Sequence, residues 1–343
     1  MKVQLLIDGA PSKVTSSIAQ AVAVGADGVF TFEGQHDVFL PLQTAAVGSD
    51  LELMTNVAIA LPRSPLHLAH AAHDLQTYSQ GRFRLGLGSQ VRVHIEKRYG
   101  SRWDKPAKQM AEWIQATKAI LDSWQSGAPL DFRGEYTQHR IMSPNFNPGP
   151  NEFGVPPVLL GALGPIMTRT AGQYADGLLV MPFCSRRHFA ENTVPALKEG
   201  FDRAGRSGDN FSIIAQAMVA VGETDERIAA ARNAVARLVS FYGSTPAYLP
   251  VLEIEGWADV HPELNALSKR GDFAAMRDLI TDEMVDRIAV VGTPSQVAAE
   301  IGARFGAHSD EVCCYFPGYD PGPALTRQLV DCLHEVPDVG HHG

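Results

Sequence analysis

Short runs of β-forming residues alternate with helical patterns along almost the whole of this 343-residue chain. Several runs are continuously apolar, which is typical of strands buried on both faces of a parallel sheet. The eight clearest runs cover residues 3–7, 28–32, 53–60, 83–88, 158–161, 177–181, 213–221 and 311–316. Eight strand–helix units in a chain of this length predict an α/β fold, the (β/α)8 or TIM barrel.

The segments between these runs are mostly helical in pattern, at residues 16–24, 65–78, 107–124, 166–175, 226–239 and 294–305. Two segments break the alternation. Residues 126–156 carry many Gly and Pro and predict a hairpin around Phe132–Met142, whereas residues 242–287 have helical patterns and no good strand. We therefore expect one barrel domain over residues 1–343, with both segments inserted near its C-terminal mouth.

The composition excludes several classes of function. The chain is 45% hydrophobic and 20% charged, which is ordinary for a globular protein. Its formal net charge is −9 and no basic run is longer than two residues, which argues against nucleic acid or an anionic membrane as a partner. No apolar stretch reaches the ~18 residues of a membrane span, and the N-terminal apolar run is too short for a signal peptide. We expect a cytoplasmic protein.

A metal site is not expected from the cysteines or histidines. The four cysteines show no CxxC spacing and predict buried reduced thiols rather than a zinc site: Cys184, Cys313, Cys314 and Cys332. Three histidines recur every third residue in one predicted helix: His67, His70 and His73. That helix is expected on the outside of the barrel, which favours packing and solvated positions over metal binding. The terminal residues 341–343 are expected to form a solvated tail.

One strand–helix junction has the composition of an anion site. The apolar run that ends at Gly161 passes through Ala162-Leu163-Gly164-Pro165 into a helical pattern. The first turn of a helix presents unpaired N–H groups and the positive end of the dipole, and glycine lets a ligand approach the backbone closely. Such turns also join strands to helices where no ligand binds, so the junction alone leaves both interpretations open.

Polar residues follow the predicted strands at the barrel end where active sites lie. Glu33 and His36 follow the second strand, three residues apart, and belong either to a functional site or to a surface loop. Asp8 and Asp37 also follow strands, and each is either a site residue or the cap of the next helix. Asn56 interrupts an apolar strand, so its amide needs a buried partner in the protein or in a ligand. No G-x-S-x-G, P-loop or HExxH motif is present.

Four segments together resemble the luciferase-like flavin superfamily. They are residues 55–80 (TNVAIALPRSPLHLAHAAHDLQTYSQ), 81–100 (GRFRLGLGSQVRVHIEKRYG), 158–180 (VLLGALGPIMTRTAGQYADGLLV) and 287–301 (RIAVVGTPSQVAAEI). The similarity extends over nearly the whole chain in the same order, and is greatest to the branch that uses the deazaflavin coenzyme F420. It is more specific for the superfamily than for the cofactor.

The resemblance implies a (β/α)8 barrel with the cofactor ring across its C-terminal mouth. It also implies a non-prolyl cis peptide at Asn56–Val57, pressed against the back of the ring, and a cradle for the cofactor phosphate at residues 161–168. The residues that this assigns to cofactor binding are Asn56, Val57, Ser89, His94, Gly161, Ala162, Leu163, Gly164, Pro165 and Ile166.

The resemblance also places candidate catalytic residues. Glu33 matches the acidic position after the second strand, and His94 matches a position where a polar side chain touches the ring. Sugar-phosphate dehydrogenases of the superfamily have a glutamate near the position of Val91, so a sugar phosphate is not expected here. The remaining titratable candidates for proton transfer are His36, Glu33 and His94, and histidine has the most suitable unperturbed pKa.

These observations predict an oxidoreductase, expected as a homodimer, that moves a hydride between C5 of F420 and an unidentified small organic substrate. The first alternative is an FMN-dependent monooxygenase on the same barrel. A non-redox phosphate-binding barrel is a second, although a strand-end lysine for Schiff-base chemistry is lacking. A non-catalytic flavin-binding protein is the third.

Overall fold

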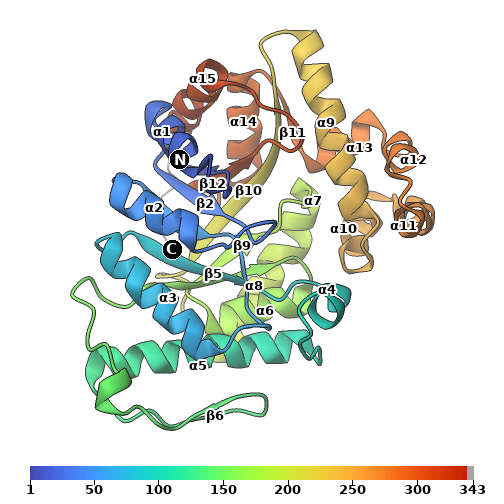
Figure 1. Ribbon diagram of the computed structural model, residues 1–343. Coiled ribbons are helices and arrows are strands. Elements are labelled where there is room, and N and C mark those ends of the chain that lie inside the picture. Colours follow the sequence, from blue (N-terminus) through green and yellow to red (C-terminus); the bar gives the residue numbers. More distant parts are fainter. Residues whose placement is uncertain (338–343) are drawn as a thin grey trace.

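Eight parallel strands close into a barrel in this computed structural model, which describes residues 1–337 (Figure 1). The strands, in order around the barrel, are β1 (Lys2–Leu6), β2 (Gly28–Thr31), β3 (Glu52–Thr55), β5 (Phe83–Gly88), β8 (Val158–Ala162), β9 (Gly177–Val180), β10 (Ser212–Val221) and β12 (Glu311–Tyr315). Pairing of β1 with β12 completes the circle. The predicted barrel is confirmed; the predicted tail at 341–343 lies outside the described residues.

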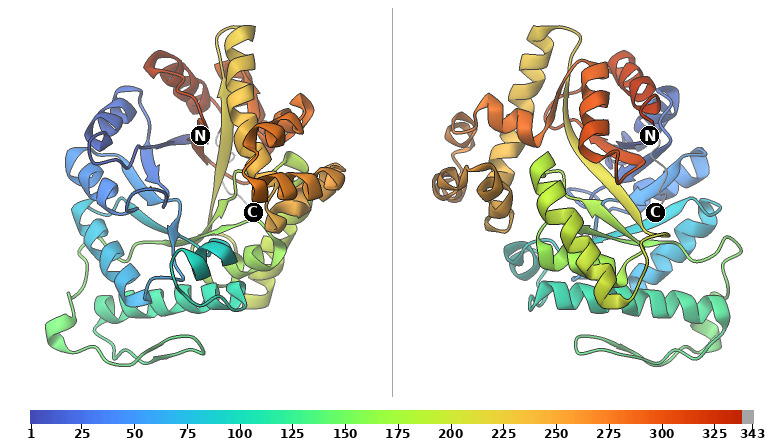
Figure 2. Two further views of the ribbon diagram at one scale, coloured as in Figure 1. Left: turned by 45° about the vertical axis from the view of Figure 1, so that its right-hand side comes forward. Right: turned by 180° about the vertical axis from the view of Figure 1, so that it is seen from behind.

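Helices cover the outside of the barrel (Figures 1 and 2). They are α1 (Val14–Ala23), α2 (Leu40–Gly48), α3 (Pro65–Tyr78), α5 (Pro106–Ser126), α6 (Pro165–Tyr174), α8 (Val194–Ala204), α9 (Asp225–Gly243), α14 (Pro294–Phe305) and α15 (Pro323–His334). Their starts follow ordinary capping rules. Ser64 accepts a bond from the Leu66 N–H ahead of α3, and Thr293 and Gln296 form a capping box on α14.

Alternation along each strand divides the core in two. Side chains that face the barrel axis form one buried cluster: Phe30, Met54, Leu159, Leu179, Ile214 and Cys313. Their strand neighbours, such as Val29, Leu53 and Val312, belong to the larger core between strands and helices. Below the axial cluster, Arg84 binds Glu311 at 2.5 and 2.6 Å. This layer of side chains fills the N-terminal end of the barrel. A ligand site is therefore expected at the C-terminal end.

Two strands differ from the prediction. The run at 53–60 is not one continuous strand. Residues 56 and 57 interrupt it, so that β3 ends at Thr55 and β4 (Ala58–Ile59) follows. A short additional strand, β11 (Val290–Gly292), pairs with residues 219–221 of β10, beyond the part of β10 that pairs with β12. Three residues are too few for hydrophobic periodicity to reveal a strand, so β11 was not predicted.

The first insertion holds the predicted hairpin, β6 (Phe132–Arg133) and β7 (Gln138–His139), and η1 (Pro144–Phe146). It connects the end of α5 to the start of β8, at the barrel end opposite the mouth, and the hairpin lies along α5 (Figure 2). The Glu112 carboxylate fixes the hairpin by accepting backbone N–H bonds from residues 135, 136 and 137. The prediction that this insertion lies near the mouth therefore holds only for the tip of the hairpin, where the Tyr136 hydroxyl donates to Asp104.

The second insertion is helical, as predicted. It contains η3 (Pro246–Tyr248), α10 (Leu249–Glu255), η4 (Ala258–Val260), α11 (His261–Arg270), α12 (Phe273–Asp278) and α13 (Asp282–Ile288). Both views of Figure 2 place α11 and α12 outside α9, away from the strands. The beginning of the insertion is closer to the barrel, since the Tyr242 and Phe183 rings lie 5.9 Å apart and Phe183 follows the mouth end of β9.

The remaining short helices follow strand ends: α4 (Arg92–Lys97), α7 (Arg186–His188) and the π-helical turn η2 (Phe189–Thr193). All four cysteines are free, with Cys332 half-buried and the other three buried, which confirms reduced thiols. Over residues 1–337, no helix combines the length and the apolar character that crossing a membrane requires.

Candidate active site

A bulge between β3 and β4 forms one wall of the mouth. The peptide bond between Asn56 and Val57 is cis, as predicted. The Val57 side chain lies over two neighbouring strands: a Cβ on Gly88 would be 2.4 Å from Val57 Cγ2, and one on Gly161 would be 3.0 Å from Val57 Cγ1. Val57 thus reaches across β5 to β8, and the two glycines leave the space that its methyl groups occupy.

Asn56 carries an unused hydrogen-bond donor below this bulge. The residue is 7% exposed, and its backbone N–H donates to the Thr31 carbonyl at 2.7 Å. Its Nδ2 has no hydrogen-bond partner among the described residues. Burial raises the pKa of the nearby Cys313 thiol, with a smaller opposing effect from Asn56. Buried amide nitrogens are normally bonded, so Asn56 Nδ2 is an unsatisfied donor inside the barrel, beside Cys313.

Glu33 is held by three donors from other elements. Its Oε2 accepts from the Ile59 N–H at 2.8 Å and from Arg63 at 2.5 Å, and its Oε1 accepts from the Tyr99 hydroxyl at 2.9 Å. Burial and the Glu33 bond raise the pKa of Tyr99. No hydrogen bond joins Glu33 to His36 within residues 1–337. Glu33 connects the loop after β2 to β4, to the segment before α3 and to Tyr99 after α4.

Sequence reasoning missed Arg63 and Tyr99. Arg63 also donates to the Ile59 carbonyl at 2.8 Å, and its own carbonyl accepts from Trp113 at 2.7 Å. The sequence did contain one indication of its role. Arg63 follows the apolar run at 57–61, and a cation in such surroundings needs a buried acceptor.

The other candidate polar residues lie in the segments after β2 and β5. His36 is exposed, and its Cβ lies 3.7 Å from the place a Cβ would occupy on Gly9, in the loop after β1. His94 is half-buried on α4, and the Ser89 hydroxyl donates to the Gln90 carbonyl at 3.1 Å. His36, Glu33 and His94 all lie at the mouth end of the barrel. Within residues 1–337, no hydrogen bond joins them to one another.

The junction at 161–168 has an open helix start. Gly164 is the residue before α6, no side chain caps it, and Pro165 begins the helix as expected. An added Cβ on Gly164 would meet no atom within 4 Å, and Ile166 is 61% exposed. The first N–H groups of α6 are therefore accessible to an anion. Gly161 touches Val57, so this junction adjoins the bulge.

Several candidates have structural roles. Asp37 accepts bonds from the Phe39 and Leu40 N–H groups at the start of α2, and Asp8 accepts from the Ala10 N–H. The rings of His70 and His73 lie 4.7 and 5.6 Å from that of Trp124, which confirms that they pack on the exterior. Within residues 1–337, no three His, Cys, Asp or Glu side chains are grouped so as to hold a metal ion.

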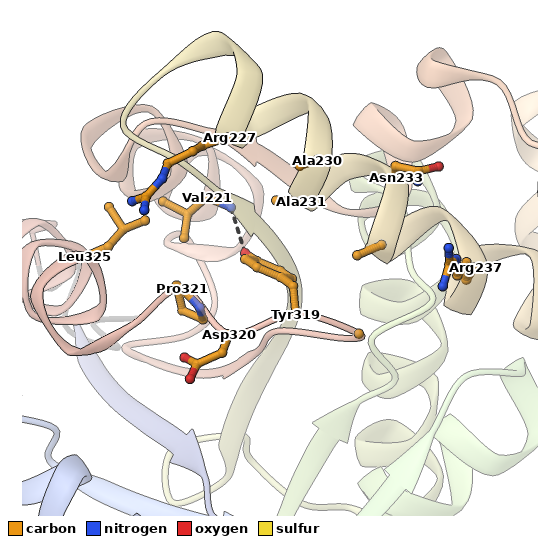
Figure 3. A pocket seen from close by; sticks show the side chains of 12 residues that line it. Val221, Arg227, Ala230, Ala231, Asn233, Arg237, Tyr319, Asp320, Pro321 and Leu325 are labelled. Carbon is orange, nitrogen blue, oxygen red and sulfur yellow. Dashed lines mark hydrogen bonds between the residues drawn. The ribbon is translucent and has the colours of Figure 1, made fainter.

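A separate hollow of about 370 Å³ lies between α9 and the loop after β12 (Figure 3). Its Tyr319 hydroxyl donates to the Val219 carbonyl and accepts from the Val221 N–H at 2.8 Å. This tyrosine thus satisfies backbone groups at the end of β10. The hollow contains none of the candidate site residues, and we assign the active site to the mouth instead.

Comparison with known proteins agrees with this geometry. An uncharacterised protein of Mycobacterium tuberculosis is 45% identical over 318 residues, which are 91% of this chain and 94% of that protein. The 5,10-methylenetetrahydromethanopterin reductase of Archaeoglobus fulgidus is 31% identical and aligns over 78% of this chain and 77% of its own.

The fold is shared with the coenzyme F420-dependent tetrahydromethanopterin reductase of Methanopyrus kandleri. The TM-score is 0.78 at 22% identity, over 98% of this chain and 97% of that one. The model of the luciferase-like monooxygenase family matches residues 6–310, which is most of the chain. The chain therefore belongs to the luciferase-like monooxygenase family, within a superfamily of oxidoreductases that use F420 or FMN.

Proposed function

We propose that this protein is an F420-dependent oxidoreductase that transfers a hydride between the cofactor and a small organic substrate. The observation that carries the proposal is the contact of Val57 with Gly161, at 3.0 Å from a Cβ position there. This contact places the bulge, which can support a ring, directly beside the start of α6, which can bind a phosphate. The 30% identity to a putative coenzyme F420-dependent oxidoreductase of Mycobacterium tuberculosis, over 85% of this chain, supports F420 over other cofactors.

The residues at the mouth fit such a cofactor. The first N–H groups of α6 would bind its phosphate, with Gly164 allowing close approach. Val57 would lie against its ring, and Asn56 holds the bulge in place through its backbone bond to the Thr31 carbonyl. When bound, F420 supplies a carbon that accepts or releases a hydride. The protein's remaining task is to orient the substrate and to handle a proton.

His36 is the proposed acid–base residue. Hydride transfer at a carbonyl or hydroxyl carbon requires a group that gives or takes the proton on oxygen. Glu33 already binds Ile59, Arg63 and Tyr99, whereas the exposed His36 side chain makes no hydrogen bond within residues 1–337. His94 is the alternative proton donor, on the helix α4 that follows β5.

FMN is the second candidate cofactor, because the matching family is described as luciferase-like monooxygenases. Reduced FMN reacts readily with oxygen, whereas F420 carries hydride. The two proposals therefore differ in the reaction as well as in the cofactor, and a binding comparison separates them.

The test is a side-by-side titration of the purified protein with F420 and with FMN, followed by absorbance or fluorescence. We expect tighter binding of F420. Gly164→Val should weaken it by more than ~1.4 kcal/mol, or about tenfold, by obstructing the phosphate. Gly48→Val is the matched control, since an added Cβ there also meets no atom within 4 Å. Tighter binding of FMN would transfer the proposal to a monooxygenase; unchanged affinity in Gly164→Val would exclude the cradle.

A further inference from the structure

One segment at the mouth is only lightly packed on the barrel. This segment, residues 91–101, contains α4 and is called the α4 segment below. The Ser101 N–H donates to the Ile95 carbonyl at 2.9 Å, which closes the end of the segment on its own helix. Ile95 is the one buried residue of α4, and no helix or strand of the described residues packs extensively against α4. Segments with so few buried contacts open at a low cost in free energy.

The backbone on either side of the α4 segment allows it to turn. Gln90, immediately before the segment, has a φ of 60°, which residues other than glycine rarely adopt. Two hydrogen bonds with its neighbours support this conformation: Gln90 Oε1 accepts from the Val91 N–H, and the Gln90 carbonyl accepts from the Ser89 hydroxyl. After the segment, the buried Gln109 side chain of α5 binds the Asp104 N–H at 2.9 Å and fixes the chain again. The segment can therefore turn about Gln90 and the residues just before Asp104.

Two side chains near the end of the α4 segment bind the loop after β2. The Tyr99 hydroxyl donates to Glu33 Oε1 at 2.9 Å, and the Arg98 guanidinium donates to the Gly34 carbonyl at 2.8 Å. The Arg98 guanidinium also lies over the Tyr99 ring, 5.1 Å from its centroid. We call Arg98 and Tyr99 the clasp. Glu33 is itself fixed, because its carboxylate also accepts a backbone N–H of β4.

The α4 segment is attached on both sides of the bulge. Its start follows Gly88 of β5, the glycine against which the Val57 methyl groups lie. Its end is bound through the clasp to Glu33, which holds the strand that follows the bulge. A segment attached at these two places borders any ligand that rests on Val57.

We propose that the α4 segment is a lid, that the clasp keeps it closed, and that the cofactor enters and leaves when the clasp releases the loop after β2. Within residues 1–337, the side-chain hydrogen bonds that leave the segment are those of Arg98 and Tyr99, so breaking the bonds at one end frees it. Both are positioning residues, which act by holding the segment. The inference rests on the proposed function, because a lid is needed only if a ligand occupies the mouth.

The experiment uses the double variant Arg98→Met and Tyr99→Phe, which removes both donors of the clasp. Hydrogen–deuterium exchange with mass spectrometry measures the amide protection of residues 91–101 without any ligand. We expect exchange there to be at least about tenfold faster than in the wild type, and exchange in β1 and β12 to be unchanged. The matched control combines Arg92→Met, which loses only an exposed pair inside α4, with Tyr78→Phe, at a 50% exposed position on α3. It should change the exchange of the segment by less than about twofold.

Stopped-flow mixing with F420, followed by fluorescence, measures how fast the cofactor enters and leaves. In the double variant, association and dissociation should both be at least about threefold faster. Loss of a direct contact with the cofactor would speed dissociation alone, so faster association distinguishes a lid from a binding residue. Tyr99→Phe alone should give a smaller change in the same direction, and it keeps the test decisive if the double variant is unstable.

The outcomes separate this proposal from the proposed function. Unchanged exchange of residues 91–101 in the double variant would overturn the clasp. Faster exchange with unchanged association would overturn the lid, since the segment would then move without admitting the cofactor. Failure of the wild-type protein to bind F420 would instead overturn the proposed function, and the same rates measured with FMN would then decide whether the α4 segment is a lid.

Discussion

The Glu33 carboxylate accepts the backbone N–H of Ile59 at 2.8 Å, which ties the loop after β2 to the strand β4 that follows the bulge. Arg63 and Tyr99 bind the same carboxylate. A residue that resembles a catalytic acid in the sequence is thus a junction between four segments of the mouth. Its position determines how Val57 and the loops around it are held.

The first prediction concerns this junction. Glu33→Ala should lower the free energy of unfolding by about 3 kcal/mol, because it leaves the Arg63 cation and the Ile59 N–H without their buried acceptor. Urea unfolding measures the loss. Glu96→Ala, which removes an exposed pair with Arg92, is the control and should cost less than about 0.5 kcal/mol. Equal stabilities of the two variants would contradict the structural role of Glu33.

The second prediction concerns the space beneath the bulge. Gly88→Ala should destabilise the protein by about 1–3 kcal/mol and weaken F420 binding, since the new methyl group would lie 2.4 Å from Val57 Cγ2. Adding Val57→Ala should restore part of the stability, as it removes the clashing methyl. A double-mutant cycle measures the coupling. Simple additivity of the two substitutions would show that Val57 and Gly88 do not contend for the same space.

The third prediction concerns proton transfer. His36→Ala should lower kcat by at least ~100-fold on the true substrate, the usual contribution of a general acid–base group. Its affinity for F420 should remain within a few-fold of wild type, because His36 is exposed and distant in sequence from the cradle. Stopped-flow measurement of the hydride step gives the rate. Near-normal turnover where chemistry is rate-limiting would move the role to His94.

The fourth prediction concerns pH. His188 is buried, its Nε2 has no partner among the described residues, and its Nδ1 lies 3.5 Å from Cys184 Sγ. Burial lowers the pKa of His188 from 6.5 to about 4. Between these values the unfolded chain binds more protons than the folded one, so the free energy of unfolding falls as pH falls from 6.5 to 4. The total loss from this group is about 3 kcal/mol.

His188→Phe should flatten this part of the pH–stability curve, measured by urea unfolding between pH 7 and pH 4.5. His67→Gln, at an exposed position on α3, should leave the curve unchanged. A curve for His188→Phe as steep as that of the wild type would assign the acid sensitivity to other groups.

The barrel, the helical second insertion and the exterior histidines could be predicted from sequence because each depends on local pattern. Continuous apolar runs and the spacing between them are properties of neighbouring residues, and they suffice to identify a parallel barrel. The cis bond at Asn56–Val57 was predicted from the resemblance alone, whereas the junction at Gly164 was visible in its own glycine-rich sequence. The short strand β11 escaped because its pairing with β10 depends on distant residues rather than on its own three.

What a side chain does at the mouth was decided only by the tertiary structure. The chain shows Glu33 and His36 three residues apart, but the donors that bind Glu33 come from residues 59, 63 and 99, so its role is set by contacts across four segments. The Phe32 and Tyr315 rings lie 6.4 Å apart although they are distant in sequence, and only closure of the barrel between β1 and β12 brings them together. Local propensity fixes strands and helices; long-range contacts, which no window of sequence contains, fix which polar groups remain unpaired and able to bind a ligand.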